Sequence, residues 1–162
     1  GERWHDALAK SFRYQENHSD FSVRIRHGDN IVSASEAISG SLFVGSKDTY
    51  THAILNPPYT KNQTNSIHQK SLRRAGIETV NLYSGFLALT LEQLMTGGHL
   101  VAIVPRSFCT GPYYQPFREY VFQRSAKKRL HLFKSRTNAF KSDSVLQENV
   151  IIHQGKHLAI CR

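Results

Sequence analysis

The spacing of apolar residues along the chain predicts strands that alternate with helices. Period-two alternation, short apolar runs and bounding turn residues predict strands at residues 21–26, 50–55, 99–104, 129–133 and 149–152. The run at 99–104 is nearly all apolar and ends at Pro105, which is typical of a central parallel strand buried on both faces. After the last strand, a turn at 154–156 is expected to lead into residues 157–161.

Apolar residues spaced three or four positions apart predict helices at residues 4–14, at 81–95 and from Pro116 onward. The helix at 81–95 has a wide apolar face that suits packing on a sheet, and Gly97-Gly98 is expected to end it. The remaining segments are expected to be irregular: a crossover with at most one helical turn at 31–49, and loops at 60–76 and 106–114. A strand, a covering helix and a parallel strand form a right-handed βαβ unit, so the predicted fold class is α/β.

The length and composition suit one domain or a substantial part of one. The chain has 162 residues, of which 40% are hydrophobic, and this is enough to form a packed core. No apolar run is long enough to cross a bilayer, and the first residues lack the pattern of a signal peptide. We therefore expect a cytoplasmic protein that makes no membrane contact.

The charge of the chain favours a polyanionic partner. Lys and Arg number 21 against 12 Asp and Glu, which gives a net charge of +9 and a pI near 9.8. Segments 60–76 and 124–141 contain no acidic residue at all. The first of these is equally compatible with a mobile loop that contacts phosphates and with a solvated loop. Charge alone indicates nucleic acid without distinguishing DNA from RNA.

The cysteines and histidines do not indicate a metal site. Cys109 and Cys161 lack the paired spacing of a zinc site or a redox dithiol, which predicts two reduced thiols. Of the 9 histidines, only His153 and His157 are four residues apart, and Gly155 between them argues against a helix that presents both. No bound metal is expected.

The candidate chemistry follows the strand at 50–55, in the tetrapeptide Asn56-Pro57-Pro58-Tyr59. Its two prolines end the strand and stiffen the backbone, so that Asn56 is held at a strand's carboxyl end. In open α/β sheets, ligands bind at that edge. Asp29 also follows a predicted strand. For both positions an ordinary turn is the alternative, because Gly-Asp-Asn and Asn-Pro sequences are turn-forming by composition alone.

The order of several motifs resembles the catalytic domain of the S-adenosylmethionine-dependent DNA adenine-N6 methyltransferases of restriction-modification systems. The similarity runs from residue 21 to residue 153 and rests on Gly28-Asp29, Asn56-Pro57-Pro58-Tyr59, the helix beginning Asn81-Leu82-Tyr83, the run from Gly97-Gly98 to Pro105, and Asn138-Ala139-Phe140. It implies a Rossmann-like class I methyltransferase sheet with flanking helices.

The resemblance makes Asn56, Pro57, Pro58 and Tyr59 the catalytic residues. The Asn56 side chain and the Pro57 carbonyl would accept hydrogen bonds from the adenine amine, which makes its nitrogen nucleophilic without a covalent enzyme intermediate. Tyr59 would stack on a base flipped out of the duplex, and Phe140 would meet its other side or edge.

The same resemblance implies contacts to the cofactor and to DNA. Asp29 matches the acidic position that contacts the adenine ring of S-adenosyl-L-methionine, and Asn56 would lie beside the cofactor as well as the base. Lys61 and Arg106 are expected to bind the DNA substrate, and Phe108 to line the same cleft.

The chain departs from this family in the half that holds the methyl donor. The family's glycine-rich loop and the acidic residue ending its second strand have no counterpart here, and residues 1–14 are too few to contain them. Residues 1–162 are therefore expected to be the central and C-terminal part of a methyltransferase domain without its first two strands. Such a chain is expected to bind S-adenosylmethionine weakly or not at all.

Other functions share part of this pattern. RNA adenine methyltransferases and methyltransferases of protein glutamine carry the same tetrapeptide, and the basic segments favour nucleic acid over protein. A non-catalytic nucleic-acid-binding module that inherited the fold is the alternative from a different class. A specificity or endonuclease domain or subunit is the expected partner, because target recognition in the family usually lies in a separate domain.

Overall fold

The computed structural model describes residues 10, 13, 27–40, 49–79, 81–133 and 148–157. Its strands form a 4-stranded sheet in the order β1-β2-β4-β3. β1 pairs with β2 in parallel, and β4 pairs antiparallel with both β2 and β3. The strands are β1 (Tyr50–Leu55), β2 (Leu94–Pro105), β3 (Ser125–Leu132) and β4 (Asn149–Lys156). This mixed sheet with flanking helices confirms the α/β prediction.

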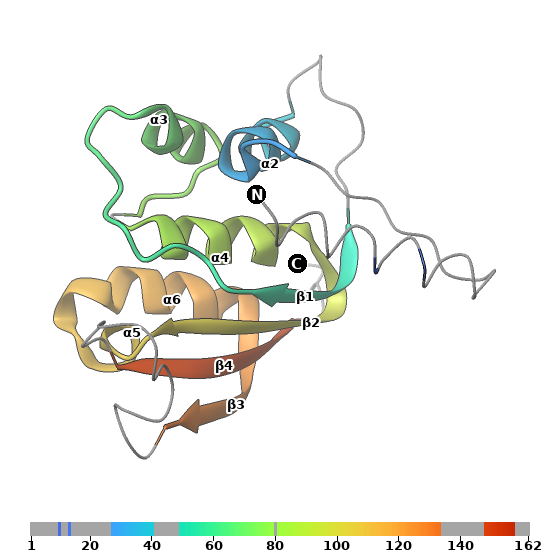
Figure 1. Cartoon of the computed structure of the whole chain (residues 1–162), viewed down its shortest axis with the longest axis vertical. Coiled ribbons are helices and arrows are strands. Elements are labelled where there is room, and N and C mark those ends of the chain that lie inside the picture. Colours follow the sequence, from blue (N-terminus) through green and yellow to red (C-terminus); the bar gives the residue numbers. More distant parts are fainter. Residues whose placement is uncertain are drawn as a thin grey trace.

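The main helices lie in two layers beside the sheet (Figure 1). α4 and α6 pack on the strands, whereas α2 and α3 lie beside each other beyond α4. The described helices are α2 (Asn30–Ile38), α3 (Ile67–Arg74), α4 (Leu82–Gln93), α5 (Ser107–Thr110), the 3₁₀ helix η1 (Pro112–Tyr114) and α6 (Gln115–Arg124). β1, α4 and β2 form the predicted parallel crossover, which brings the carboxyl ends of β1 and β2 to the same edge of the sheet.

The core is centred on α4, which is buried nearly all round. Leu87, Ala88, Leu89 and Leu91 are each at most 1% exposed, because the sheet covers one side of the helix and the outer helices cover the other. The strands contribute alternating buried residues, namely Leu100, Ala102 and Val104 from β2 and Val150 and Ile152 from β4. Full burial of one such side chain contributes about 1.5–3 kcal/mol.

The other face of the sheet is more open. On β1, Ile54 is 86% exposed, and on β2, Val101 is only half-buried. A row of histidines crosses this face: His52 stacks on His99 with ring centroids 5.5 Å apart, and His99 Nδ1 lies 3.0 Å from His153 Nε2. β2 is central, as predicted, but the prediction that it is buried on both faces is wrong.

The boundary between α4 and β2 also differs from the prediction. α4 ends at Gln93 and β2 begins at Leu94, so Gly97-Gly98 lies within the strand and does not end the helix. Residues 95–98 bulge between two paired positions of the β1–β2 ladder. Gly97 has a φ of 78°, which favours glycine, so the pair of glycines forms the bulge.

Several segments expected to be irregular are regular. α2 occupies most of the described part of 31–49, α3 occupies the second half of 60–76, and α5 and η1 lie within 106–114. β4 continues through 154–156, where a turn was expected, because these residues pair with β2 and β3. The predictions for 21–26 and 158–161 lie outside the described residues, as does most of 4–14, of which residues 10 and 13 are helical. Among the described residues, none of the helices has the length and apolar character needed to cross a bilayer.

A polar cluster ties the carboxyl end of α4 to α6. Tyr120 Oη and Arg124 Nε both donate to Glu92 Oε1, at 2.8 Å and 2.7 Å. The Arg124 guanidinium also lies 3.6 Å from the centre of the Tyr120 ring. Burial tends to raise the pKa of Glu92, but the hydrogen bonds from Arg124 and Tyr120 outweigh it and lower the pKa. Glu92 therefore stays charged and holds the two helices together.

Candidate active site at the carboxyl ends of the strands

The tetrapeptide Asn56-Pro57-Pro58-Tyr59 lies directly after β1, as the sequence predicts. Pro57 is buried, whereas Asn56 is exposed at the edge of the sheet. Within the described ranges, the Asn56 side chain has no hydrogen-bond or ionic partner. Its amide is therefore free to accept hydrogen bonds from a ligand at this edge.

Tyr59 is held in a fixed orientation beside Asn56. Its Oη donates to the carbonyl oxygen of Ile103 in β2 at 3.3 Å. Its ring meets the ring of Tyr83 edge-on, with centroids 6.2 Å apart and an interplanar angle of 89°. Burial raises the pKa of Tyr59, so the hydroxyl remains a donor at neutral pH.

The residues after Tyr59 are joined to the start of α4. The Leu82 amide donates to the Thr60 carbonyl at 3.0 Å, and Lys61 forms an isolated antiparallel bridge with Asn81. Asn81 Nδ2 donates in turn to Tyr114 Oη at 2.9 Å. The backbone of the tetrapeptide is thus anchored on both sides, while the side chain of Lys61 remains exposed.

Asp29 caps α2, and its carboxylate is hydrogen-bonded to His68 of α3. Its Oδ1 accepts hydrogen bonds from the amides of Ile31 at 3.0 Å and Val32 at 3.3 Å, so the residue begins a helix and is not a plain turn. Its Oδ2 lies 2.6 Å from His68 Nε2. The carboxylate is still 46% exposed, which leaves room for a further donor.

The pKa of Asp29 depends on His68. Partial burial tends to raise the pKa, but the hydrogen bonds from His68 and the Val32 amide outweigh it and hold the pKa below its ordinary value of 3.8. Because the pKa is lower in the folded state, the ionised carboxylate stabilises the fold above pH 3.8, and this contribution is lost as the pH falls through the lowered value.

Replacing His68 by Ala is expected to raise the pKa of Asp29 toward 3.8, because the carboxylate loses its side-chain donor. The measurement is a titration of the Asp29 carboxyl carbon by NMR. His131→Ala is the matched control, since His131 is exposed and lies on β3. An unchanged Asp29 titration in His68→Ala would show that this hydrogen bond does not form in solution.

The other predicted site residues have different surroundings. Arg106 Nη1 forms an ion pair with Glu148 Oε2 at 2.7 Å at the edge where β2 ends, and remains 53% exposed. Phe108 is 3% exposed and packs against Phe117 with centroids 5.9 Å apart, so the expectation that it lines a cleft is wrong. Phe140 lies outside the described residues.

No role at the site was predicted for His68, which supports Asp29, or for Tyr83, which supports Tyr59 and was named only in the motif that begins a helix. A signal for α3 was present, because Ser66-Ile67-His68-Gln69 fits the pattern of a capping box. Ser66 Oγ accepts from the Gln69 amide at 3.2 Å, and Gln69 Oε1 accepts from the Asn65 amide at 2.8 Å. The position of Tyr83 beside Tyr59 depends on how the chain folds back and has no local signal.

The chain matches known proteins over most of its length. A family model described as Eco57I restriction-modification methylase matches residues 3–140. Type II methyltransferase M.BsuBI of Bacillus subtilis is 58% identical over 111 residues, which are 68% of this chain and 22% of that protein. Type II methyltransferase M.PstI of Providencia stuartii is 50% identical over 107 residues, which are 66% of this chain and 21% of that protein. The chain therefore spans about a fifth of the length of these relatives.

Solved structures share the fold at low sequence identity. A Listeria monocytogenes protein described as a class I S-adenosylmethionine-dependent methyltransferase has a TM-score of 0.55 at 13% identity over 76% of this chain and 36% of that one. A chain of a type I restriction-modification system has a TM-score of 0.62 at 13% identity over 83% and 25%. The type IIG restriction endonuclease BpuSI has a TM-score of 0.54 at 20% identity over 70% and 14%. These likenesses show a class I methyltransferase fold.

Proposed function

The chain belongs to the Eco57I restriction-modification methylase family, and we propose that the full-length protein transfers a methyl group from S-adenosylmethionine to the N6 amine of an adenine in DNA. The observation that carries the proposal is the exposed, unengaged amide of Asn56, held at the carboxyl end of β1 by buried Pro57 and anchored Tyr59. The names of the relatives, which are Type II methyltransferases, support the reaction class.

Asn56 and Pro57 would activate the amine by accepting its hydrogens. The Asn56 carbonyl oxygen and the Pro57 backbone carbonyl each take one N–H hydrogen bond. Two acceptors on one side draw the nitrogen lone pair out of conjugation with the ring, so that it becomes nucleophilic. An amide is a poor base, so the excess proton leaves to water once the nitrogen carries the methyl group. Positioning of the amine against the methyl donor therefore contributes most of the rate enhancement, and no covalent enzyme intermediate is needed.

Tyr59 would hold the adenine after it leaves the duplex. Its hydroxyl is tethered to β2 and its ring packs perpendicular to that of Tyr83, so the ring has a constant orientation for stacking. Stacking on an aromatic ring contributes about 1–3 kcal/mol per base and offsets part of the cost of extruding the base. Phe140 remains the predicted second aromatic contact.

The methyl donor fits the chemistry of Asp29. A half-exposed carboxylate with a lowered pKa is charged at neutral pH and can accept a hydrogen bond from the amino group of the cofactor's adenine ring. Asn56 would lie between this cofactor and the target base. When bound, S-adenosylmethionine supplies an electrophilic methyl group.

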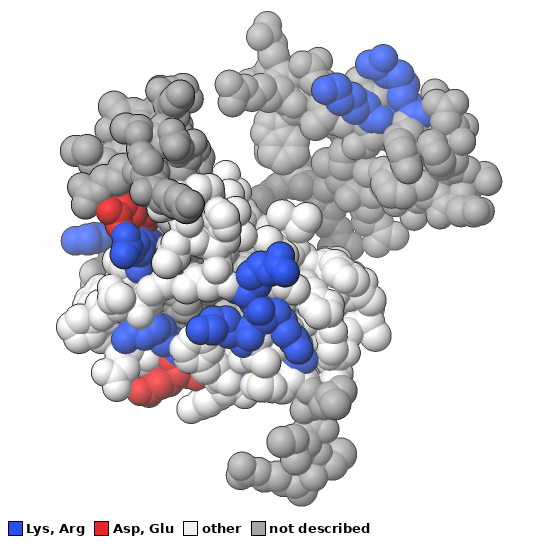
Figure 2. Space-filling view, turned by 90° about the horizontal axis from the view of Figure 1, so that it is seen from below, with Lys and Arg blue, Asp and Glu red and all other residues white. Residues whose placement is uncertain are grey.

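The charge distribution supports a DNA substrate. α3 carries exposed Lys70, Arg73 and Arg74 after the tetrapeptide, in a segment without acidic residues. Around β3 the described surface also bears more basic than acidic side chains (Figure 2), and Lys127, Lys128 and Arg129 of that strand are exposed. Such cations would contact phosphates without reading sequence. We therefore propose that a specificity or endonuclease domain or subunit selects the target.

The test is to identify the methylated base. The full-length protein is incubated with DNA and labelled S-adenosylmethionine, and the DNA is digested to nucleosides. N6-methyladenine is the expected labelled product. Labelled N4-methylcytosine would contradict the proposed base, label in RNA alone would contradict the proposed nucleic acid, and no transfer at all would favour a non-catalytic binding module.

A further inference from the structure

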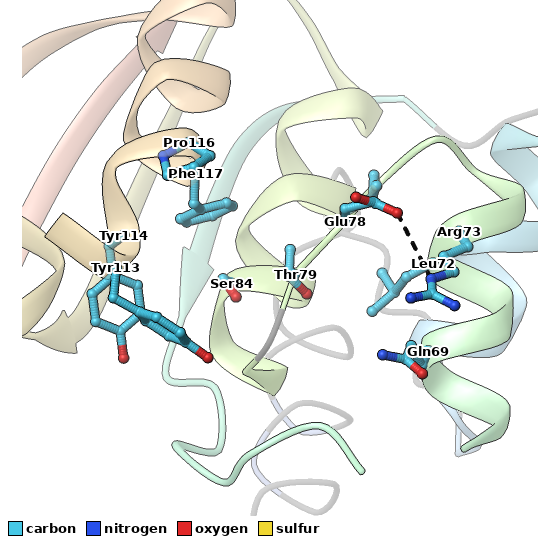
Figure 3. Close-up of a pocket in the computed structure, with 11 residues that line it drawn as sticks. Gln69, Leu72, Arg73, Glu78, Thr79, Ser84, Tyr113, Tyr114, Pro116 and Phe117 are labelled. Carbon is cyan, nitrogen blue, oxygen red and sulfur yellow. Dashed lines mark ion pairs between the residues drawn. The ribbon is translucent and has the colours of Figure 1, made fainter. Parts of the chain in front are cut away.

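A cavity of about 260 Å³ lies beside the candidate active site, between α3, the start of α4 and η1 (Figure 3). Tyr113, Tyr114 and Phe117 form an aromatic side, and Gln69 and Arg73 of α3 face them across it. Thr79 and Ser84 lie between the two sides. None of these residues belongs to the tetrapeptide or forms one of the hydrogen bonds of the Asp29 side chain, so this is a separate site.

The aromatic side has one anchored ring and one exposed ring. Tyr114 is held by the hydrogen bond that its Oη accepts from Asn81 Nδ2 at 2.9 Å. Tyr113 meets Tyr114 edge-on with centroids 5.1 Å apart, but is itself 61% exposed. In the part of the chain that is described, the Tyr113 hydroxyl has no hydrogen-bond partner. An exposed ring braced by an anchored one is a platform on which a flat group can stack.

The opposite side offers groups that bind polar edges. Gln69 uses its Oε1 to accept from the Asn65 amide, so its NH₂ group remains available as a donor. Ser84 Oγ donates to the Asn81 carbonyl at 2.8 Å and keeps its lone pairs as acceptors. Arg73 and Glu78 face each other at 3.8 Å and are both exposed. A flat ligand with donors and acceptors on its edge fits between these groups and the tyrosines.

Ring contacts connect this cavity to the tetrapeptide. Tyr59 contacts Tyr83 at 6.2 Å between centroids, and Tyr83 contacts Tyr114 at 6.0 Å. Successive nucleotides of one strand are about 3.4 Å apart along a duplex axis, so a base a few positions from one that lies on Tyr59 can reach Tyr114 when it also leaves the stack. Arg73 of α3 lines the cavity, and Lys70 and Arg74 of the same helix are also exposed. These cations can contact the phosphates of the bound strand.

We propose that this cavity binds an unpaired nucleobase of the same DNA, a few positions from the target, stacked on Tyr113 and hydrogen-bonded by Gln69. The inference rests on the proposed function in that the substrate is nucleic acid. It adds a second base contact that anchors the strand while the target adenine lies on Tyr59. Because the contact uses a base edge, it also contributes to the choice of flanking sequence.

The test combines Tyr113→Ala in the full-length protein with a scan of abasic sites. Duplexes carrying the target and one abasic nucleotide at each neighbouring position in turn are titrated without cofactor. At one position, the abasic site is expected to weaken binding to the unmodified protein by about 5–150-fold, which corresponds to the loss of one stacked base. Tyr113→Ala is expected to weaken binding of intact DNA by a similar factor. On that abasic duplex, the variant is expected to bind as weakly as the unmodified protein does.

Two further variants keep the result decisive. Tyr113→Phe retains the ring and is expected to bind like the unmodified protein. Phe122→Ala removes an aromatic that is 45% exposed on α6, outside the cavity, and is expected to leave binding unchanged. If Tyr113→Ala binds DNA normally, or binds every abasic duplex more weakly by the same factor, the cavity does not take a base. Since binding is read without methylation, failure of methyl transfer would leave this result intact.

Discussion

Replacing Asn56 by Ala in the full-length protein is expected to lower kcat for methyl transfer by about 10²–10³-fold, the usual effect of removing one preorganised hydrogen-bonding group that acts in the transition state. Asn56 is exposed, and its side chain has no hydrogen bond or ion pair within the described residues, so its loss removes an acceptor without disturbing the fold. The Pro57 carbonyl remains and accounts for residual activity.

The measurement is single-turnover transfer of labelled methyl groups to DNA, with binding of DNA and cofactor measured in parallel. Asn56→Asp keeps an acceptor oxygen and is expected to retain part of the rate. Gln123→Ala removes an exposed amide on α6 and is the matched control. A normal kcat in Asn56→Ala would exclude an acceptor role for this residue.

Replacing Gly98 by Ala is expected to destabilise the protein by about 1–3 kcal/mol, as overpacking of a tight site does. A Cβ at this position would lie 2.9 Å from two backbone carbonyl oxygens, those of Met95 and Thr51. Neither can move without shifting the bulge or the β1 strand. Since β1 carries the tetrapeptide at its end, the folded variant is also expected to lose activity.

The measurement is the free energy of unfolding in urea. Gly28→Ala is the control, because no atom of the described residues lies within 4 Å of its added Cβ, and it is expected to stay within about 0.5 kcal/mol of the unmodified protein. Equal stability of Gly98→Ala and Gly28→Ala would mean that the bulge adapts to a methyl group and is not a tight constraint.

The parts of the fold that were predictable have local causes. The strand at Tyr50–Leu55, its end at the prolines and the crossover helix before β2 follow from apolar spacing and from proline chemistry. α2 was missed because its start depends on Asp29, which was interpreted as a residue after a strand and not as a helix cap. α3 was missed because its polar, basic composition is typical of a loop, and the capping pattern at its start was not recognised.

Errors at the site come from contacts between distant segments. Phe108 follows the predicted active edge in sequence, but its burial against Phe117 depends on how α6 packs. His68 lies 39 residues from Asp29 in sequence, and no local pattern relates the two. The position of Asn56 at the carboxyl end of β1 was predictable because it depends only on the strand before it and on the two prolines after it.

The sheet order has a consequence for how the protein folds. β4 comes last among the described strands, yet it lies between β2 and β3 and pairs with both. The unit of β1, α4 and β2 can form from neighbouring segments, whereas β3 has no described partner strand until β4 arrives. Folding is therefore expected to have an early phase at the tetrapeptide's strand and a later one in which β4 inserts, because long-range pairing is slow. During synthesis, the end of β1 that carries Asn56 would form before β4 completes the sheet.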